Sequence, residues 1–368
     1  MTIAEHTTAA PAPSDLELAV EETVASFVDA VASAAFISMV AIGDRLGLYG
    51  ALADLGGATA GDLAATSGCN ERLVLEWLSC NASAGYVDHV VDDRGDDRFT
   101  IGPAAAALLA DEGSPVFLAS AATLVRSYFT DQDQLESAFR GSGGIDWGDH
   151  HDCMFTAVER FYGNAYSTSL TSEWIPSVPG LAEKLTAGAS VADVGCGHGV
   201  STALMAEAYP QSTFHGFDFH DGSIRRAREV AVERGVTSNV QFSTRTATDF
   251  DGGPYDVVCV FDALHDMGDP GAVIRHARSL LADDGVVLLV EAQAGDDRAT
   301  SIANPLGRLF YAASTVLCTP CALSQGGPEA LGNQVGAARW EQIFVANGFS
   351  RFERSLETPF NLILAARP

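Results

Sequence analysis

The chain has 368 residues, of which 47% are hydrophobic, and a formal net charge of −27. This length is enough for two domains with substantial buried cores. The acidic balance, with Lys184 as the single lysine, argues against nucleic acid and anionic membrane as partners. We expect no membrane-spanning run and no signal peptide, and therefore a cytoplasmic protein.

The N-terminal part of the sequence predicts a tail followed by a small domain. Residues 1–14 are rich in alanine, proline and threonine and are expected to form a flexible tail. Residues 15–115 are expected to form the first domain, with helices over 15–48, 58–68 and 70–79 and short strands starting at 85 and 98. This order indicates a helix-turn-helix followed by a two-stranded wing.

The predicted wing decides between two functions of this domain. A winged helix indicates DNA binding only by analogy, and a DNA-binding wing is basic. Here the wing carries Asp92, Asp93, Asp96 and Asp97. A packing or dimerisation module is therefore favoured. The apolar residues of 15–48 exceed what a two-layer domain buries, which predicts a homodimer.

Residues 116–180 are expected to form a helical linker that covers a pocket. The sequence predicts one helix over 115–139 and a glycine-rich break at 141–149. Phe161, Tyr162 and Tyr166 precede the second domain, where a covering helix would lie. We expect one or more of them to contact a ligand, and the alternative is that they are core residues.

A glycine-rich turn opens the second domain, which is predicted over residues 181–368. A short apolar strand ends at Asp193, and Gly195-Cys196-Gly197-His198-Gly199 precedes a helix. Strand, glycine turn and helix form a nucleotide-type site at the carboxyl edge of a parallel sheet. Val200 stands where a dinucleotide motif needs its third glycine, and no lysine follows, so neither that motif nor a phosphate loop is indicated.

Acidic residues end the following strands. The second strand ends at Asp218, nineteen residues after Gly199, where a carboxylate accepts ribose hydroxyls. The third leads to Thr246, with Asp249 as the alternative contact for a base. A continuous apolar run to Phe261 marks a central buried strand. Strand–helix alternation predicts a mostly parallel, doubly wound α/β sheet of seven strands, in which the last two, 349–357 and 360–366, form an antiparallel hairpin.

The pattern D-x-G-x-G-x-G after a strand, with an acid at the end of the next strand, resembles motif I of the class I S-adenosylmethionine-dependent methyltransferases. The resemblance covers about residues 180–368 and implies a Rossmann-like domain that binds S-adenosylmethionine. It implies these cofactor-binding residues: Asp193, Gly195, Cys196, Gly197, Asp218, Phe219, Thr246, Ala247, Phe261 and Asp262.

The stretch LHDMGDPGAVIRHARSLLADDGVVLLVE, residues 264–291, is similar to small-molecule O-methyltransferases with an N-terminal winged helix, and the overall likeness is nearer to actinobacterial members. In this family the N-terminal domain builds the dimer and closes the substrate pocket. The resemblance implies that His265 is a general base whose ring Asp266 or Glu291 holds. Gln334 stands near the place of the family's second flanking acid. A structural role for His265 is the alternative.

A long insertion, residues 296–335, separates the fifth strand from the last helix. Insertions at this edge are usually lids, and its apolar residues, Phe310 among them, favour a hydrophobic or aromatic substrate. The alternative is a segment that packs only on its own domain. Cys318 and Cys321 cannot complete a tetrahedral metal site alone, and residues 150–153 are interpreted as a polar loop, so we expect no metal.

These features together predict an S-adenosylmethionine-dependent methyltransferase that acts on a small hydrophobic or aromatic acceptor, at oxygen. Two alternatives remain on the sequence alone. One is a winged-helix regulator or binding module with S-adenosylmethionine as effector. The other is a non-methylating reaction on the same fold, such as decarboxylation or hydroxylation.

Overall fold

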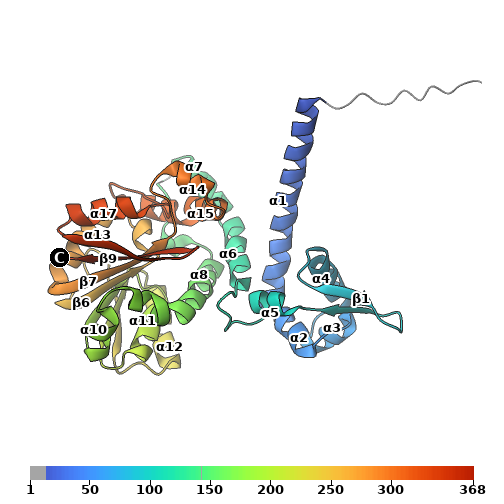
Figure 1. The fold of residues 1–368 in the computed structure, drawn as a ribbon, viewed down its shortest axis with the longest axis horizontal. Coiled ribbons are helices and arrows are strands. Elements are labelled where there is room, and N and C mark those ends of the chain that lie inside the picture. Colours follow the sequence, from blue (N-terminus) through green and yellow to red (C-terminus); the bar gives the residue numbers. More distant parts are fainter. Residues whose placement is uncertain (1–13, 142) are drawn as a thin grey trace, which may run out of the picture. The chain divides into compact units, whose positions relative to one another are not determined.

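The computed structural model describes residues 14–141 and 143–368, so nearly all of the expected tail, residues 1–14, lies outside the described residues. The chain divides into two compact units, Met1–Asp111 and Glu112–Pro368. The predicted linker, residues 116–180, belongs to the same compact unit as the sheet. We describe each unit by itself (Figure 1).

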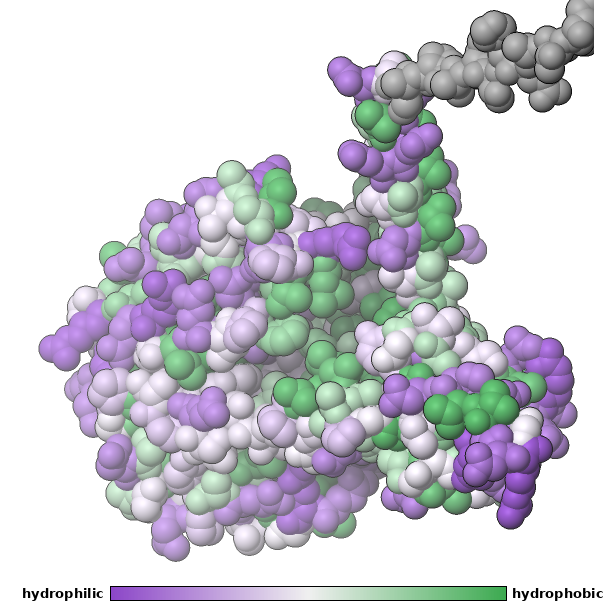
Figure 2. Space-filling model, turned by 45° about the vertical axis from the view of Figure 1, so that its right-hand side comes forward, coloured by the Kyte–Doolittle hydropathy of each residue, from purple (hydrophilic) through white to green (hydrophobic). Residues whose placement is uncertain are grey.

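A long helix, α1 (Asp15–Arg45), opens the first unit. The Ser14 side chain accepts a hydrogen bond from the Glu17 amide, and the Glu17 carboxylate accepts one from the Ser14 amide, which is a capping box. Only the C-terminal part of α1 is buried, where a Cβ on Gly43 would lie 2.5 Å from Trp77 Cζ2. Apolar side chains remain exposed along its N-terminal part (Figure 2): Leu16, Leu18, Val20, Val24, Phe27, Val28 and Val31.

Within the described residues, α1 is the one helix that is long and apolar enough to cross a membrane. This corrects the expectation that the sequence holds no such segment. The sequence does not show one continuous run of large apolar residues here, because alanine and serine stand between them. Asp29 is nevertheless the only charged residue between Val24 and Ile42. Length and composition alone do not assign α1 to a membrane, because a helix that buries its apolar face against protein passes the same test.

The rest of the first unit is the predicted winged helix. Its elements are α2 (Leu48–Leu55), α3 (Ala60–Ser67), α4 (Glu71–Ser83), β1 (Asp88–Val91), β2 (Asp97–Thr100) and α5 (Pro103–Leu109). β1 pairs antiparallel with β2, and Leu52, Leu63 and Leu78 are fully buried. The first strand starts at Asp88, three residues later than predicted, because residues 84–87 form the turn that ends α4.

The second unit contains a seven-stranded sheet in the order β5-β4-β3-β6-β7-β9-β8. Its strands are β3 (Ser190–Val194), β4 (Thr213–Asp218), β5 (Val240–Thr244), β6 (Tyr255–Phe261), β7 (Leu281–Ala292), β8 (Arg351–Glu357) and β9 (Asn361–Arg367). β3 to β7 are parallel, and β9 is antiparallel to both of its neighbours. The strand order reverses between β3 and β6, and ligands bind at such a switch point in open α/β sheets.

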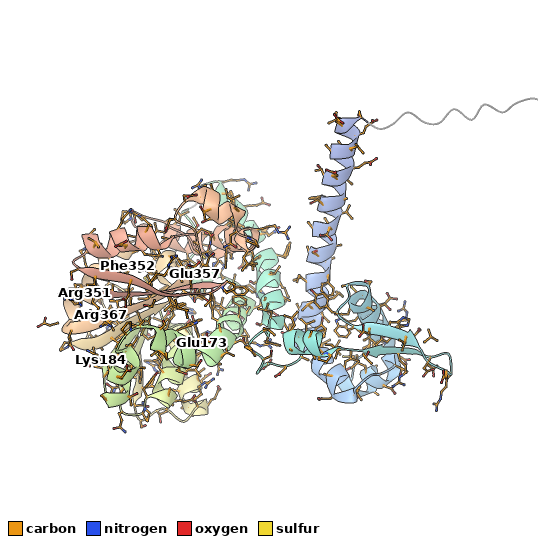
Figure 3. All side chains as sticks on the ribbon, in the orientation of Figure 1. Glu173, Lys184, Arg351, Phe352, Glu357 and Arg367 are labelled. Carbon is orange, nitrogen blue, oxygen red and sulfur yellow. The ribbon has the colours of Figure 1, made fainter. Side chains whose placement is uncertain are left out.

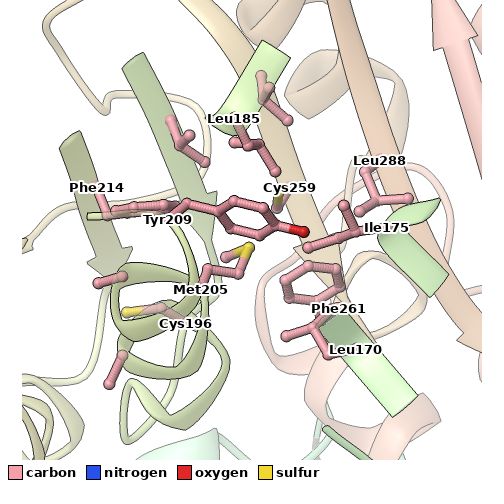
Figure 4. Close-up of a cluster of buried hydrophobic side chains, with 14 of the residues drawn as sticks. Leu170, Ile175, Leu185, Cys196, Met205, Tyr209, Phe214, Cys259, Phe261 and Leu288 are labelled. Carbon is pink, nitrogen blue, oxygen red and sulfur yellow. The ribbon is translucent and has the colours of Figure 1, made fainter. Parts of the chain in front are cut away.

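Helices cover both faces of this sheet (Figure 1). One face packs against α10 (Leu181–Ala187), α11 (Val200–Ala208) and α12 (Asp221–Glu233), and the other against α13 (Pro270–Leu280) and α17 (Ala337–Ala346). Alternate residues of each strand face opposite layers, so Val191 lies in one core and Ala192 in the other. Figure 4 shows the first core, where Cys259 and Leu288 from the strands meet Met205 of α11.

The edge of the sheet is charged. β8 is one of the two edge strands, and Figure 3 shows Arg351 and Glu357 at its two ends, with Arg367 of β9 beside Arg351. Charged side chains on an exposed edge disfavour pairing with another strand. Lys184, also labelled there, donates to the Asp284 carboxylate at 2.8 Å.

The helices before the sheet differ from the prediction at one point. The prediction of a single helix over 115–139 was wrong, because the chain forms two helices, α6 (Ala119–Thr130) and α7 (Gln132–Phe139), with a break at Asp131. The buried Asp131 carboxylate instead accepts a hydrogen bond from the His150 ring at 2.8 Å. His150 lies in a loop before α8, as predicted, but its side chain is fully buried.

Two helical segments of the second unit contain wide π-helical turns. α8 (Asp152–Ala165) continues into a π-helix, Tyr166–Trp174, and then α9 (Ile175–Ser177). The predicted lid, residues 296–335, contains α14 (Arg298–Ala303), α15 (Gly307–Ala313), a second π-helix (Ser314–Cys318) and α16 (Thr319–Ser324). π-helical turns are rare and occur frequently at functional sites.

Candidate active site

A cavity of about 320 Å³ lies at the carboxyl ends of β3, β4 and β6, at the switch point of the sheet. This volume is at the lower end of the range of small-molecule sites. Of the residues predicted to bind the cofactor, these line the cavity: Gly195, Cys196, Gly197, Asp218, Phe219, Thr246, Ala247, Phe261 and Asp262. Asp193 is 1% exposed and lies behind the lining.

The glycines of the turn serve two different needs. All three have positive φ, which disfavours any side chain. A Cβ at Gly195 would lie 2.9 Å from Ala263 Cβ, and one at Gly199 would lie 2.6 Å from Phe242 Cζ. A Cβ at Gly197 would meet no atom of the described protein within 4 Å. Gly197 therefore borders open space in the cavity, whereas its two neighbours allow close packing of the chain.

Asp218 is fixed at the end of β4 by backbone donors. Its Oδ2 accepts from the Gly197 amide at 3.0 Å and its Oδ1 from the His220 amide at 2.9 Å. Burial raises the pKa of this carboxyl, and the two amides oppose the rise. Each oxygen keeps a further lone pair, so the carboxylate remains able to accept hydroxyl groups from a ligand in the cavity.

Asp193 stabilises the glycine turn through hydrogen bonds to the helix that follows it. Its Oδ2 accepts from Ser201 Oγ at 2.8 Å and Thr202 Oγ1 at 2.6 Å, and both donors belong to the first turn of α11. Burial raises its pKa to about 6. Its Oδ1 is buried without a hydrogen-bond partner in the described part of the chain.

A second carboxyl, Asp262, faces the cavity at the end of β6. It has φ 47°, in the left-handed region that a residue with a side chain rarely adopts. The Asn361 amide donates to Oδ1 at 3.1 Å, and the Tyr166 hydroxyl donates to Oδ2 at 3.4 Å. Burial and the neighbouring charge of Glu291 raise its pKa to about 8. Backbone strain at such a point is typical of functional sites.

His265 lies behind the cavity wall and has its two ring nitrogens engaged by carboxylates. It is 2% exposed, Nδ1 is hydrogen-bonded to Glu291, and Nε2 lies 3.1 Å from Asp266 Oδ1. Burial alone would lower the pKa of His265, but Glu291 and Asp266 outweigh it and raise that pKa well above its usual value. Of these three residues, Asp266 alone lines the cavity.

The predicted substrate residues divide into two groups. Tyr162 and Tyr166 line the cavity, with ring centroids 6.1 Å apart. Phe161, Phe310 and Gln334 do not line it, which corrects their placement in the pocket. Phe161 packs against the buried cluster around Met154, and Phe310 is 9% exposed within α15. The Gln334 amide is directed to Asn333.

Several lining residues were missed by the sequence analysis: Asp146, Trp147, Val158, Glu159, His198, Arg245, Met267 and Gln325. His198 stands within the glycine turn, and its Nδ1 lies 2.8 Å from Glu159 Oε2. Trp147 lies within the glycine-rich break at 141–149, which was the available signal for a segment that approaches a ligand. Cys321 also lines the cavity.

Comparisons with known proteins address both units. Residues 185–344 match the family model "Methyltransferase domain", and residues 34–110 match the "Rv2258c-like winged HTH domain". The ubiquinone biosynthesis O-methyltransferase of Haemophilus ducreyi is 34% identical over 107 residues, which are 28% of this chain and 44% of that protein. The Bordetella avium enzyme is 33% identical over 122 residues, which are 32% of this chain and 47% of that protein. The chain thus spans less than half of the curated relatives it matches.

Solved structures resemble nearly the whole chain. A putative O-methyltransferase of Nostoc punctiforme has a TM-score of 0.68 at 19% identity, over 97% of this chain and 99% of that one. Human N-acetylserotonin methyltransferase, solved with S-adenosylmethionine, has a TM-score of 0.65 at 16% identity, over 98% of this chain and 99% of that one. These likenesses confirm the predicted fold class: a Rossmann-like methyltransferase domain preceded by a winged helix.

Proposed function

We propose that this protein, whose residues 185–344 belong to a methyltransferase domain family, transfers a methyl group from S-adenosylmethionine to an oxygen of a small hydrophobic or aromatic acceptor. One observation carries the proposal. The cavity at the switch point joins a hydrogen-bonded carboxylate, Asp218, to the open space beside Gly197. That combination suits a nucleoside whose ribose hydroxyls donate to the carboxylate.

The residues around the cavity fit this cofactor. Asp218 would accept the ribose hydroxyls, and Phe219, Thr246 and Ala247, which line the same cavity, would contact the adenine. Asp262 offers a carboxylate for the ammonium group of the methionyl part, which would offset the burial of that acid. The bound cofactor supplies an electrophilic methyl group, and the protein must place the acceptor oxygen in line with it at about 3 Å.

Aromatic side chains favour a hydrophobic acceptor. Trp147, Tyr162 and Tyr166 line the cavity, and Met267 adds a further apolar surface. Asp266 and Gln325 are polar groups on the same wall, and few polar groups in an apolar pocket are typical of sites that orient one ligand. We therefore propose a hydroxylated aromatic compound as the acceptor class.

Replacing Asp218 by alanine is expected to weaken the binding of S-adenosylhomocysteine by about ten- to a hundredfold. A hydrogen bond to a charged acceptor contributes about 1.5–3 kcal/mol, which corresponds to this factor. Titration calorimetry measures the affinity. Asp283→Ala is the matched control, because Asp283 is exposed and does not line the cavity. Unchanged affinity in folded Asp218→Ala, or a loss in the control alone, would contradict the assignment.

The reaction itself is tested with S-adenosylmethionine and a panel of phenols, alcohols, carboxylic acids and amines. Mass spectrometry should detect S-adenosylhomocysteine together with an O-methylated aromatic product. A decarboxylated or hydroxylated product without methylation would instead identify the non-methylating alternative. Saturable binding to specific DNA in a gel shift, without any product, would favour a regulator. The acidic wing, with Asp92 and Asp93 beside Arg94, does not support DNA binding.

We also propose that the protein is a cytoplasmic homodimer that pairs through α1. Leu16, Val20, Val24, Phe27 and Val31 are exposed on α1 at spacings of three and four residues, which places them on one helix face. A second copy of this helix would bury that stripe, as in a coiled coil.

Light scattering of the full-length protein at micromolar concentration is expected to give a dimer of the 38.5 kDa chain. The double variant Val24→Glu with Phe27→Glu should shift it to a monomer, because it places charges in the apolar stripe. Val232→Glu is the control, since Val232 is equally exposed but lies on α12. A monomeric wild type, or one that sediments with lipid vesicles, would contradict this assembly.

A further inference from the structure

Three potential metal ligands from distant parts of the sequence meet beside the cavity. A ring nitrogen of His265, an Asp266 carboxylate oxygen and Cys318 Sγ all lie within 4.8 Å of one another. His265 and Asp266 belong to the short turn Leu264–Asp266 after β6, and Cys318 ends the π-helix of the insertion. The sequence analysis expected no metal because it paired Cys318 with Cys321 rather than with the histidine.

We infer that His265, Asp266 and Cys318 form a binding site for a zinc-type divalent cation. Imidazole nitrogen, carboxylate oxygen and thiolate sulfur are the donor types that zinc prefers, and a thiolate disfavours magnesium and calcium. Three protein ligands with one further position are typical of catalytic rather than structural zinc.

The surroundings of His265 match those of a metal-bound histidine. Glu291 is hydrogen-bonded to Nδ1 from the opposite side of the ring, so Nε2 is the nitrogen that faces Asp266 and Cys318. Such a carboxylate behind the ring fixes the tautomer and the orientation of a ligating histidine. Glu291 is 1% exposed and thus acts as a positioning residue.

The carboxylate of Asp266 is unsatisfied in a way that a cation would correct. Its Oδ1 is buried and, among the residues that the structure describes, has no hydrogen-bond partner, although His265 Nε2 lies 3.1 Å away. The two atoms form an ion pair when the ring is protonated. A divalent cation that displaces this proton would be held by the same nitrogen and oxygen and by the thiol beside them.

Side-chain hydrogen bonds hold the insertion against this turn. The Gln325 amide donates to the backbone oxygen of Asp266 at 2.8 Å and to that of Cys321 at 3.1 Å. Its side-chain oxygen accepts from the Gly268 amide at 3.1 Å. These contacts keep the segment that carries Cys318 beside His265, so the ligand set is built by the fold.

The site also bears on the proposed methyl transfer, and this part of the inference rests on that function. Asp266 is the member of the cluster that lines the cavity, so an acceptor reaches the cluster from that side. A divalent cation lowers the pKa of a hydroxyl group bound to it. It would thus favour the ionised form of an acceptor hydroxyl.

Titration of the metal-free, full-length protein with cobalt(II) tests the site, with zinc as competitor. We expect a single bound cobalt ion per chain, with a thiolate-to-cobalt charge-transfer band in the near ultraviolet that zinc abolishes. Cys318→Ser should lose this band, and Asp266→Asn, a milder change at a partly exposed residue, should weaken cobalt binding. Glu291→Gln should lower the affinity by about 10–100-fold, the usual effect of removing a carboxylate behind a ligating histidine.

Cys321→Ser is the matched control. Cys321 lies one helical turn from Cys318 and lines the cavity, but its Sγ is 3.8 Å from His150 Nε2 and it is not a member of the cluster. This variant should keep the band. Absence of the band in the wild type, or its persistence in Cys318→Ser, would overturn the inference.

Calorimetry with S-adenosylhomocysteine on the same samples separates this inference from the proposed function. Cofactor binding without cobalt binding would exclude the metal site and leave the methyltransferase proposal intact. Cobalt binding with the thiolate band, in a protein that does not bind the cofactor, would support the metal site and contradict the methyltransferase proposal.

Discussion

Replacing His265 by glutamine is expected to lower methyl-transfer turnover by about 10²–10⁴-fold, with nearly unchanged affinity for S-adenosylhomocysteine. His265 lies between Glu291 and Asp266, of which Asp266 lines the cavity whereas His265 does not. The expectation holds whether the ring binds a cation or transfers a proton, because glutamine does neither. Glutamine keeps a polar group facing the buried Glu291, which limits the loss of stability.

The measurement compares steady-state kinetics, calorimetry and a thermal melt for the same variants. His276→Gln is the control, because His276 is a partly buried histidine that makes one hydrogen bond, to the Phe250 backbone oxygen, away from the cavity. It should keep its turnover. Full turnover in a stable His265→Gln protein would exclude His265 from the chemistry and would favour an acceptor that is already ionised at neutral pH.

Replacing Gly199 by alanine is expected to lower the free energy of unfolding by about 2–5 kcal/mol. A residue with a side chain at φ 73° costs about 1–2 kcal/mol, and overpacking adds about 1–3 kcal/mol. The new Cβ would lie 2.6 Å from Phe242 Cζ and 2.8 Å from Ala227 Cβ. Both neighbours are buried in the core beside α11, so neither moves away freely.

Gly197→Ala separates packing from binding at the same turn. Its φ is 52°, and its Cβ would meet no described protein atom within 4 Å, so only the cost of the left-handed backbone applies, about 1–2 kcal/mol. That Cβ would instead enter the space assigned to the cofactor and should lower affinity for S-adenosylhomocysteine. Denaturant unfolding and calorimetry measure the two quantities. Equal losses of stability in the two variants would contradict the distinct roles of the two glycines.

The site could be predicted from sequence wherever a residue's position follows from its own strand. Asp218 and Asp262 each lie at or directly after the carboxyl end of a parallel strand, and the carboxyl ends of parallel strands meet at one edge. Gly195 and Gly197 occupy the turn after such a strand. Hydrophobic periodicity and the spacing of the glycine motif were therefore sufficient to predict where these residues lie. The break between α6 and α7 was not predictable in this way, because Asp131 ends α6 through a contact with His150, nineteen residues away.

By itself, the sequence predicted the strands of the sheet, the winged helix and the glycine turn after the first strand of the sheet, since these depend on hydrophobic period and on local turn chemistry. Only the tertiary structure decided that His265 lies outside the cavity lining, that Phe161, Phe310 and Gln334 do not line it, and that Cys318 meets His265. These depend on side-chain direction and on the packing of the insertion against the turn after β6. The packing of the insertion has no local signature, because it joins residues more than fifty positions apart, such as Asp266 and Gln325.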